Sequence, residues 1–266
     1  MSYSSASEIL DVPCPACGPY RRSAANRVRH VMRIWSDHNG RQTFNCMRCG
    51  AKGVRDIPAT PRPSFCLHRA NAGPRTQLAQ HLWRRALALH RTPVEAYLRD
   101  ARGYRGPLPQ TLRYLPPRGT HAHALVAAFG QCLEVACGEL APPDAPPAIH
   151  LTRLSPDGLS RLNKIMLGPV SGHPIVLAPM NDGLGLVIAE GIEDALSLHE
   201  ATGLGAWAAG SATHMAKLAD AVPGYVACVT LAQDDDEAGR TATNRLGAAL
   251  IARGLEVRVL SLAQAP

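Results

Sequence analysis

The last third of the chain alternates short apolar segments with segments of helical periodicity, and this order strongly limits its fold. The alternation runs from Leu184 to Leu262. The expected strands are residues 184–189, 206–209, 225–232 and 256–262, and the expected helices between them are residues 193–202, 213–222 and 238–253. Strands that alternate with helices in this way predict a parallel α/β sheet with helices on both faces.

Acidic residues stand directly after two of these expected strands. Glu190 follows the first strand, and Asp234, Asp235 and Asp236 follow the third. Alternate side chains of an extended segment point the same way, so we expect Asp234 and Asp236 to point together and Asp235 to face away. The carboxyl ends of parallel strands meet at one edge of the sheet, where ligands of such folds bind. Glu190, Asp234 and Asp236 are therefore expected to converge.

Asp194 extends this acidic group from the first expected helix. It lies one helical turn beyond Glu190, whereas Glu193 is expected to face away. Hard carboxylate oxygens suit a divalent cation such as Mg²⁺ or Mn²⁺. The alternative is a solvated acidic turn that caps the helix at 238–253, since Asp is a common N-cap. Convergence from two strands favours the metal site.

Four of the eight cysteines form two C-x-x-C-G motifs near the N-terminus. They are Cys14, Cys17, Cys46 and Cys49. Four thiolates at this spacing are the ligand set of a tetrahedral, structural zinc site. Residues 28–35 and 41–45 are expected to be strands around a turn at residues 37–40. The pattern predicts a zinc ribbon that needs its metal to fold, because so small a module buries little apolar surface.

Basic residues are concentrated in the first part of the chain. Residues 1–118 hold 20 of the 28 Lys and Arg residues but 6 of the 21 acids, and the whole chain has a net charge of +7. This asymmetry predicts that the N-terminal part of the chain binds a polyanion and that the C-terminal part binds a cation. Within the ribbon, Arg29 and Arg33 are our candidates for contacts with nucleic acid.

The middle of the chain mixes helical and extended patterns. An amphipathic helix is expected at residues 77–90, and Thr92 and Pro93 are expected to cap a second helix at 94–101. The strands expected after them are residues 124–130, 132–137, 148–154, 164–170 and 174–178. This order indicates an α+β subdomain.

Together these patterns predict four parts. The parts are a zinc ribbon at residues 1–57, a Pro-rich linker at 58–76, a basic α+β subdomain at 77–178 and the parallel-sheet domain at 179–266. No apolar run approaches the about 20 residues of a membrane-spanning helix, and the N-terminus lacks the pattern of a secretory signal. We therefore expect a cytoplasmic protein with no membrane partner.

The C-terminal pattern resembles the Toprim domain, the fold shared by bacterial primases, topoisomerases and related nucleases. The resemblance rests on Glu190-Gly191 at a strand end and on the segment Asp234–Arg240, in which Ala-Gly-Arg follows the acids. The residues that it assigns to Mg²⁺ are Glu190, Asp234 and Asp236, with Asp194 as a fourth acid.

The region before it resembles the primase-like region of zinc-binding primases from phages and plasmids. The matching stretches are residues 124–128, 149–158 and 164–169. Lys164 is one of only three lysines and lies in a matched motif, so it is our candidate for a catalytic cation. Arg153 and Arg240 are candidates for holding nucleotide or nucleic acid. With the ribbon in front, the order of parts is that of a bacterial primase.

The resemblance implies a DNA primase-like nucleotidyltransferase of a mobile element. Such an enzyme would make short primers on single-stranded DNA from nucleoside triphosphates, by metal-dependent phosphoryl transfer. Two alternatives stay open. A Toprim nuclease or nicking enzyme would use the same metals with water as nucleophile, and a degenerate Toprim site would leave a non-catalytic DNA-binding protein.

The sequence also departs from the replicative primases. Those enzymes carry a further acidic motif after the fourth Toprim strand, whereas this chain has no acid beyond Glu256. The metal site is therefore expected to be incomplete or to be completed by Asp194. The chain also lacks a helicase-type phosphate loop, so we expect it to work alone or with a separate replicative helicase.

Overall fold

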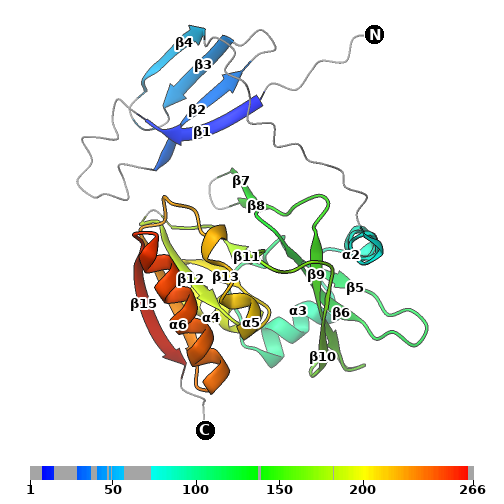
Figure 1. The fold of residues 1–266 in the computed structure, drawn as a ribbon. Helices are drawn as coiled ribbons and strands as arrows, with labels where there is room; N and C mark the ends of the chain where they lie inside the picture. Colours follow the sequence, from blue (N-terminus) through cyan, green and yellow to red (C-terminus); the bar gives the residue numbers. More distant parts are fainter. Residues whose placement is uncertain are drawn as a thin grey trace, which may run out of the picture. The chain divides into compact units, whose positions relative to one another are not determined.

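The computed structural model describes residues 8–14, 29–36, 41–46, 48, 50–56, 73–136, 139–181 and 183–262. The chain forms two compact units, Met1–Ala70 and Asn71–Pro266 (Figure 1). Within the described residues, no helix combines the length and the apolar character needed to cross a membrane.

The N-terminal unit contains a four-stranded antiparallel sheet with the order β1-β2-β3-β4. Its strands are β1 (Glu8–Pro13), β2 (His30–Ser36), β3 (Arg41–Cys46) and β4 (Lys52–Asp56). The predicted pairing of the two central strands is confirmed, with Met32 opposite Cys46 and Ser36 opposite Gln42. The outer strands β1 and β4 were not predicted. The turn predicted at residues 37–40 lies outside the described residues.

Alternation along β2 separates a buried face from a polar face. Met32 and Ile34 are buried, and they pack with Cys14 and Cys46. Arg33 points to the other face, where its guanidinium donates to both carboxylate oxygens of Asp11, each over 2.9 Å. This period of two is typical of a sheet that has one packed face.

The first part of the C-terminal unit is an antiparallel sheet with the strand order β10-β9-β6-β5. Its strands are β5 (Leu112–Leu115), β6 (Ala124–Phe129), β9 (Ala148–Leu154) and β10 (Arg161–Leu167). A separate hairpin is formed by β7 (Leu133–Ala136) and β8 (Glu139–Ala141). The strands predicted in this region are therefore largely confirmed, although β10 begins at Arg161 rather than at residue 164.

Two helical segments cover the two faces of this antiparallel sheet. Helix α2 (Pro74–Arg85) packs Trp83 against one face. The other face is covered by α3 (Pro93–Ala96) and by the π-helical turn that follows it, Tyr97–Ala101. The predicted cap is confirmed, because the Thr92 side chain accepts from the backbone N–H of Glu95.

Helix α2 ends at Arg85, earlier than the predicted end at residue 90. The reason is a backbone pairing that competes with the helix. Leu87 donates to the carbonyl of Tyr114 over 2.7 Å and accepts from its N–H over 2.8 Å. A residue that is paired to a strand in this way cannot continue the helical hydrogen-bond ladder.

The second part of the C-terminal unit is the predicted parallel sheet. Its strand order is β11-β13-β12-β14-β15. The strands are β11 (Ile175–Ala178), β12 (Gly185–Ala189), β13 (Gly205–Ala208), β14 (Cys228–Asp234) and β15 (Glu256–Leu262). Four of them are parallel, and β11 joins the edge in the antiparallel sense. The sheet therefore begins before residue 179, since β11 precedes that position.

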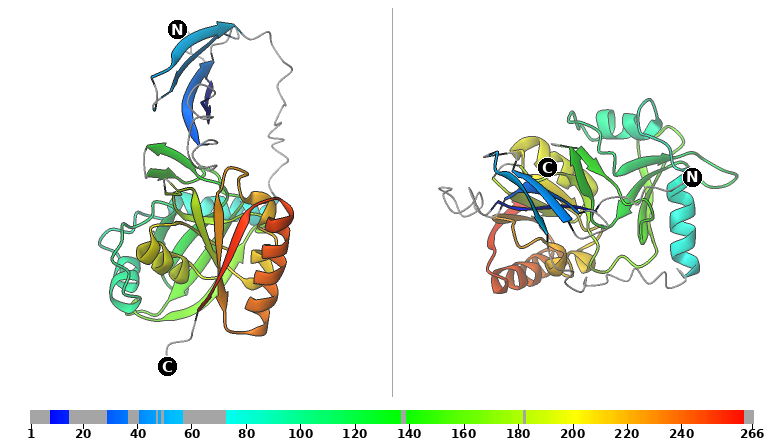
Figure 2. Two further views of the ribbon diagram at one scale, coloured as in Figure 1. Left: turned by 90° about the vertical axis from the view of Figure 1, so that its left-hand side faces the viewer. Right: turned by 90° about the horizontal axis from the view of Figure 1, so that it is seen from above.

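Helices lie on both faces of the parallel sheet, as Figures 1 and 2 show. They are α4 (Ile192–Thr202), α5 (Ala212–Met215) and α6 (Glu237–Ala252). Val187 of β12 packs in the same core cluster as residues of α4. Its neighbour Leu186 points to the opposite face and packs with residues of α5 and α6.

The helix predicted at residues 213–222 is not continuous. Helix α5 ends at Met215, and a 3-10 turn at Ala219–Ala221 follows it. The backbone N–H of Leu218 bonds to the carbonyl of Met215 over 3.1 Å, which tightens the chain at this point. The tighter turn buries Leu218 and Val222 against the sheet.

The two sheets of the C-terminal unit share one apolar core. Leu125 and Phe129 of β6 belong to the same buried cluster as Ala189 of β12. Gly130 also donates its backbone N–H to the carbonyl of Pro174 over 2.8 Å, just before β11. One face of the antiparallel sheet is therefore turned toward the parallel sheet.

Candidate functional site

The candidate site begins where β12 and β14 end. These strands are parallel neighbours, with Ile188 opposite Leu231. Glu190 follows the last residue of β12, and Asp234 is the last residue of β14. The chain leaves β12 for β13 on one side and enters β14 on the other side, so this edge is the topological switch point where α/β folds bind ligands.

Asp236 is held by the start of α6. Its Oδ1 accepts from the backbone N–H of Gly239 over 2.6 Å, which makes Asp236 the N-cap of the helix. A Cβ at position 239 would lie 2.9 Å from both the Cβ and the carbonyl oxygen of Asp234. Glycine is therefore required there, because it lets the helix start close to the strand end. The capping role and the metal role of Asp236 are compatible, since a carboxylate has a second oxygen.

Asp194 reaches the same place from the first turn of α4. Burial raises the pKa of Asp194, the neighbouring charge of Glu193 raises it further, and Lys164 opposes this. Asp194 in turn raises the pKa of Asp234. This effect indicates that the Asp194 charge acts on the Asp234 carboxylate.

Lys164 brings a positive charge into this group from the other sheet. It lies on β10 opposite Thr152 of β9, so both side chains point to the face that is turned toward the parallel sheet. Its charge acts to lower the pKa of each of four acids. They are Glu190, Glu193, Asp194 and Asp234. The charge of one cation thus acts on carboxylates that come from two strand ends and a helix start.

The carboxylates of the strand ends repel one another. Burial raises the pKa of Glu190, and the charges of Asp234 and Asp236 raise it further. Burial likewise raises the pKa of Asp234, as do Asp194 and Asp236. Half-buried acids whose pKa is raised by burial and by neighbouring carboxylates form a region of negative potential in which a divalent cation would be stabilised.

The donor chemistry of these residues fits Mg²⁺ or Mn²⁺. Carboxylate oxygens are hard ligands, and Mg²⁺ is typically held by one or two carboxylates while keeping several waters. Within the described part of the chain, no group of three or more His, Cys, Asp and Glu side chains is already arranged as a metal site.

Glu193 was predicted to face away from the acidic group, and its side chain is held by Tyr97. Its Oε1 accepts from the Tyr97 hydroxyl over 2.7 Å. Burial acts to raise the pKa of Glu193, but the bond from Tyr97 and the charges of Lys164 and Arg102 outweigh it, so the pKa is lowered. The face of α4 that sequence alone would leave to solvent is covered by the π-helical turn that carries Tyr97.

Tyr97 and Arg102 complete a second layer beside the site. Arg102 donates from Nε to the Tyr97 hydroxyl over 3.0 Å, and its guanidinium carbon lies 5.1 Å from the centre of the tyrosine ring. Burial and then the charge of Glu193 raise the pKa of Tyr97 to about 12. Tyr97 is therefore a constant donor at neutral pH, and it fixes the Glu193 carboxylate near Lys164.

His150 is a buried polar residue that sequence reasoning did not select. It is 1% exposed and faces the same side of β9 as Thr152. Its Nε2 has no hydrogen-bond partner among the described residues. A Cβ at Gly210, which follows β13, would lie 3.5 Å from His150 Cδ2. Nothing in the sequence distinguishes this histidine from others, and it becomes a candidate site residue only when the tertiary structure shows that it is buried.

The burial of His150 predicts a specific loss of stability in acid. Burial and the charge of Lys164 lower its pKa to about 4, against 6.5 in the unfolded chain. Between these values the unfolded state binds a proton that the native state does not, so the free energy of unfolding falls as pH falls. From pH 7 to pH 5 this contribution is about 2 kcal/mol.

Urea denaturation of wild type and His150→Gln at pH 7 and pH 5 measures this contribution as a difference between the two proteins. Glu193, which raises the pKa of His150, and Arg161, which lowers it, are present in both proteins and cancel from the comparison. His121→Gln, at an exposed position, is the matched control and should keep the wild-type dependence on pH. An equal loss of stability in wild type and His150→Gln would contradict the prediction.

The structure does not bring every predicted residue to this site. Arg153 lies opposite Ala124 and shares its face of the antiparallel sheet, which packs against α2 and is opposite to the face of Lys164. Arg240 is exposed and pairs with Asp235 over 3.2 Å. Asp235 itself is exposed, as predicted. Neither arginine contributes charge to the carboxylates that surround Lys164.

The N-terminal candidates belong to the other unit. Cys14 and Cys46 are buried in one cluster, while Cys17 and Cys49 lie outside the described residues. After Cys46 the chain turns tightly, since Gly50 donates its N–H to the Cys46 carbonyl over 2.9 Å. Arg33 donates hydrogen bonds to Asp11, and these bonds lower the pKa of the Asp11 carboxyl group. Arg29 lies at the start of β2 and is half-buried.

Comparison with known families agrees with this architecture. Residues 185–265 match the family model of the Toprim domain, and residues 73–177 match a family described as a domain of unknown function (DUF7146). No curated protein and no solved structure matched the chain. The predicted Toprim domain is therefore confirmed. It indicates a metal-binding protein that processes nucleic acids, because Toprim domains bind Mg²⁺ and occur in primases, nucleases and topoisomerases.

Proposed function

We propose that this protein is a primase-like nucleotidyltransferase of a mobile element, which joins nucleoside triphosphates into short primers on single-stranded DNA. The Toprim domain supports the general class, in which Mg²⁺ and DNA take part. The finer assignment is supported by the way that the second sheet completes the site. It also draws on the order of parts along the chain.

The observation that carries the proposal is the position of Lys164. A nuclease needs a metal, water and a phosphodiester, and its carboxylates suffice for that chemistry. A nucleotidyltransferase must also hold a triphosphate, whose charge the metal neutralises only in part. Lys164 reaches the carboxylates from a separate sheet and acts on Glu190, Asp194 and Asp234 at once. It is suited to bind a phosphate oxygen beside them.

Glu190, Asp234 and Asp236 would hold the catalytic Mg²⁺ or Mn²⁺, with Asp194 as a further acid. When bound, the metal would neutralise phosphate charge and orient the attacking hydroxyl. The chain's own residues would keep these carboxylates in place. The Asp236 carboxylate is held by the backbone N–H of Gly239. The Glu193 carboxylate is held by the Tyr97 hydroxyl, at a position where the charge of Lys164 acts on it.

We also propose that the N-terminal unit holds one structural Zn²⁺ through Cys14, Cys17, Cys46 and Cys49. The two described thiols fit this, because Cys14 and Cys46 come from opposite ends of the unit's sequence and lie in one buried cluster. Gly50, which follows the second motif, has a positive φ of 72°, a backbone conformation that glycine adopts without strain. Arg29 would contact the phosphates of the template.

A primer-synthesis assay tests the function. Full-length protein with zinc, Mg²⁺, labelled nucleoside triphosphates and a single-stranded DNA circle should yield short labelled products, and Lys164→Met should reduce their rate by about a hundredfold. Arg161→Met, at an exposed position on the same strand, is the matched control. Strand cleavage without incorporation of nucleotides would instead favour a nuclease, and DNA binding without any turnover would overturn both enzymatic assignments.

A further inference from the structure

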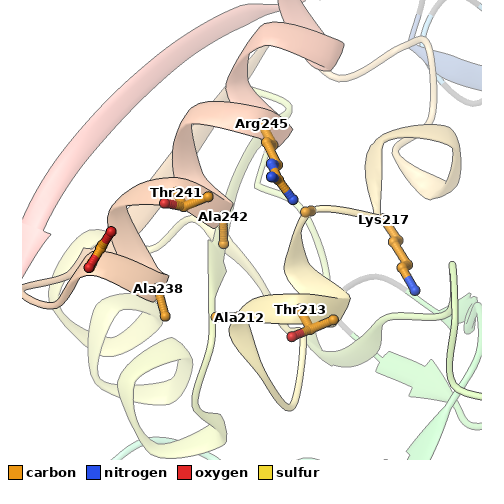
Figure 3. A pocket seen from close by; sticks show the side chains of 9 residues that line it. Ala212, Thr213, Lys217, Ala238, Thr241, Ala242 and Arg245 are labelled. Atoms are coloured by element: carbon orange, nitrogen blue, oxygen red, sulfur yellow. The ribbon is translucent and has the colours of Figure 1, made fainter.

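A groove of about 720 Å³ lies between α5 and α6, the two helices that cover the same face of the parallel sheet. The floor consists of small residues, and Figure 3 shows Ala238 and Ala242 of α6 facing the chain around Ala212. Two threonines, Thr213 and Thr241, add hydroxyl groups to the lining. The groove is partly open to solvent.

Two cations stand at the rims of this groove. Arg245 projects from α6 toward the loop that follows α5, and Lys217 projects from that loop (Figure 3). Both side chains are exposed, and neither has an ion-pair or hydrogen-bond partner among the described residues. Many surface arginines of this chain are paired, for example Arg240 and Arg258. Two unpaired cations on either side of an alanine floor therefore mark a place for an anion.

The groove lies next to the segments that carry the candidate acids. Ala212, which lines it, follows two residues after Gly210, whose backbone N–H donates to the backbone carbonyl of Glu190 over 2.9 Å. At the other side, Glu237 lines the groove and directly follows Asp236, the cap of α6. One end of the groove therefore lies at the start of α6, beside the cap residue Asp236. Glu237 is the single acid of this lining, and it stands at the end where the metal would be bound.

We propose that this groove binds the phosphodiester backbone of single-stranded DNA and guides the strand to the carboxylate site. Arg245 and Lys217 pair with successive phosphates, the threonine hydroxyls donate to phosphate oxygens, and the alanines let the backbone approach closely. The identification of the strand as a template rests on the proposed function, whereas the binding itself does not. Because the contacts are to phosphates, binding is independent of base sequence.

The expected result is a loss of affinity that depends on salt. In the full-length zinc protein without divalent catalytic metal, Arg245→Ala should weaken binding of a fluorescein-labelled oligothymidylate by about tenfold near 0.1 M salt. The slope of log K against log salt should fall by about 0.7 for each phosphate contact that is lost. Lys217→Ala should act in the same direction, and the double variant should lose both contacts. Fluorescence anisotropy between about 0.05 and 0.3 M salt measures both quantities.

Arg258→Ala is the matched control, because it also removes one exposed arginine from the same domain, but this arginine lies on β15, outside the groove, and pairs with Glu256. It should bind the oligonucleotide as wild type does. Thr241→Lys adds a cation to the groove and should tighten binding, a gain that unfolding cannot produce. If Thr241→Lys and the double variant both bind with wild-type affinity and slope, the inference is overturned.

A second arm separates the strand from free nucleotide. If the groove instead held the triphosphate, Arg245→Ala would raise the KM for nucleotide and leave the oligonucleotide affinity unchanged, and this result also overturns the inference. The oligonucleotide-binding assay tests the inference about the groove. The proposed function is tested separately by nucleotide incorporation, and it fails if the wild-type protein incorporates none.

Discussion

Asp234→Asn is expected to reduce metal-dependent turnover by about a thousandfold while leaving the fold intact. The side chain ends β14 and is half-buried beside Asp194, so the amide keeps its shape but loses the charge that attracts a divalent cation. The loss of a buried, repelled charge also relieves Asp194 and Glu190, so the free energy of unfolding should not fall. The rate of nucleotide incorporation at saturating Mg²⁺, together with thermal unfolding, measures both effects.

The adjacent acids provide matched controls for this substitution. Asp235→Asn removes the same charge one residue away, at an exposed position that pairs with Arg240, and should keep at least half of the wild-type rate. Asp236→Asn should lose turnover but keep the helix cap, because Asn caps a helix about as well as Asp does. A thousandfold loss in Asp235→Asn, or wild-type turnover in Asp234→Asn, would contradict the assignment of the strand-end acids.

Cys46→Ser is expected to release the zinc and unfold the N-terminal unit. Zinc binding stabilises such modules by about 10 kcal/mol or more, which exceeds what a sheet of this size obtains from its small apolar cluster. The C-terminal unit has its own core and should keep its thermal transition, because the chain divides at residue 70. The zinc content measured by elemental analysis should fall from one ion per chain to none. Limited proteolysis should remove the N-terminal unit selectively.

Cys132→Ser is the control for the zinc prediction. Burial raises the pKa of the Cys132 thiol to about 12, so this cysteine is an unreactive, partly buried side chain of the C-terminal unit. The variant should therefore keep one zinc per chain and an intact N-terminal unit. Zinc well below one per chain in the wild type, or a full zinc complement in Cys46→Ser, would exclude the four-cysteine site.

Local sequence was sufficient to predict those strands whose hydrophobic pattern and flanking residues indicate the same element. The apolar runs before Glu190 and Asp234 identified β12 and β14, because a buried strand and a charged strand end leave a direct pattern. The pairing of β2 with β3 was predictable for the same reason. The outer strands β1 and β4 were not, since an edge strand with polar residues on one face has only weak alternation.

Tertiary contacts decided where the local pattern has more than one outcome. Glu193 was expected to face away from the acidic group, and only the tertiary structure shows that the π-helical turn around Tyr97 holds its carboxylate. Arg153 and Lys164 were expected to act together, yet they lie on opposite faces of one sheet. The pairing of β9 with β10 contains an irregularity between Arg161 and Asn163. A shift of one residue in register exchanges the two faces, so the sequence cannot reveal which side chain reaches the site.

The sequence by itself determined the strand and helix order of the last third of the chain and the positions of its strand-end acids. It did so because hydrophobic period and strand-end chemistry are local properties. The tertiary structure alone decided that the charge of Lys164 acts on these acids from another sheet, that His150 is buried and that Arg245 borders a groove between α5 and α6. Such contacts join residues far apart in the chain, and they depend on how two sheets pack around one core.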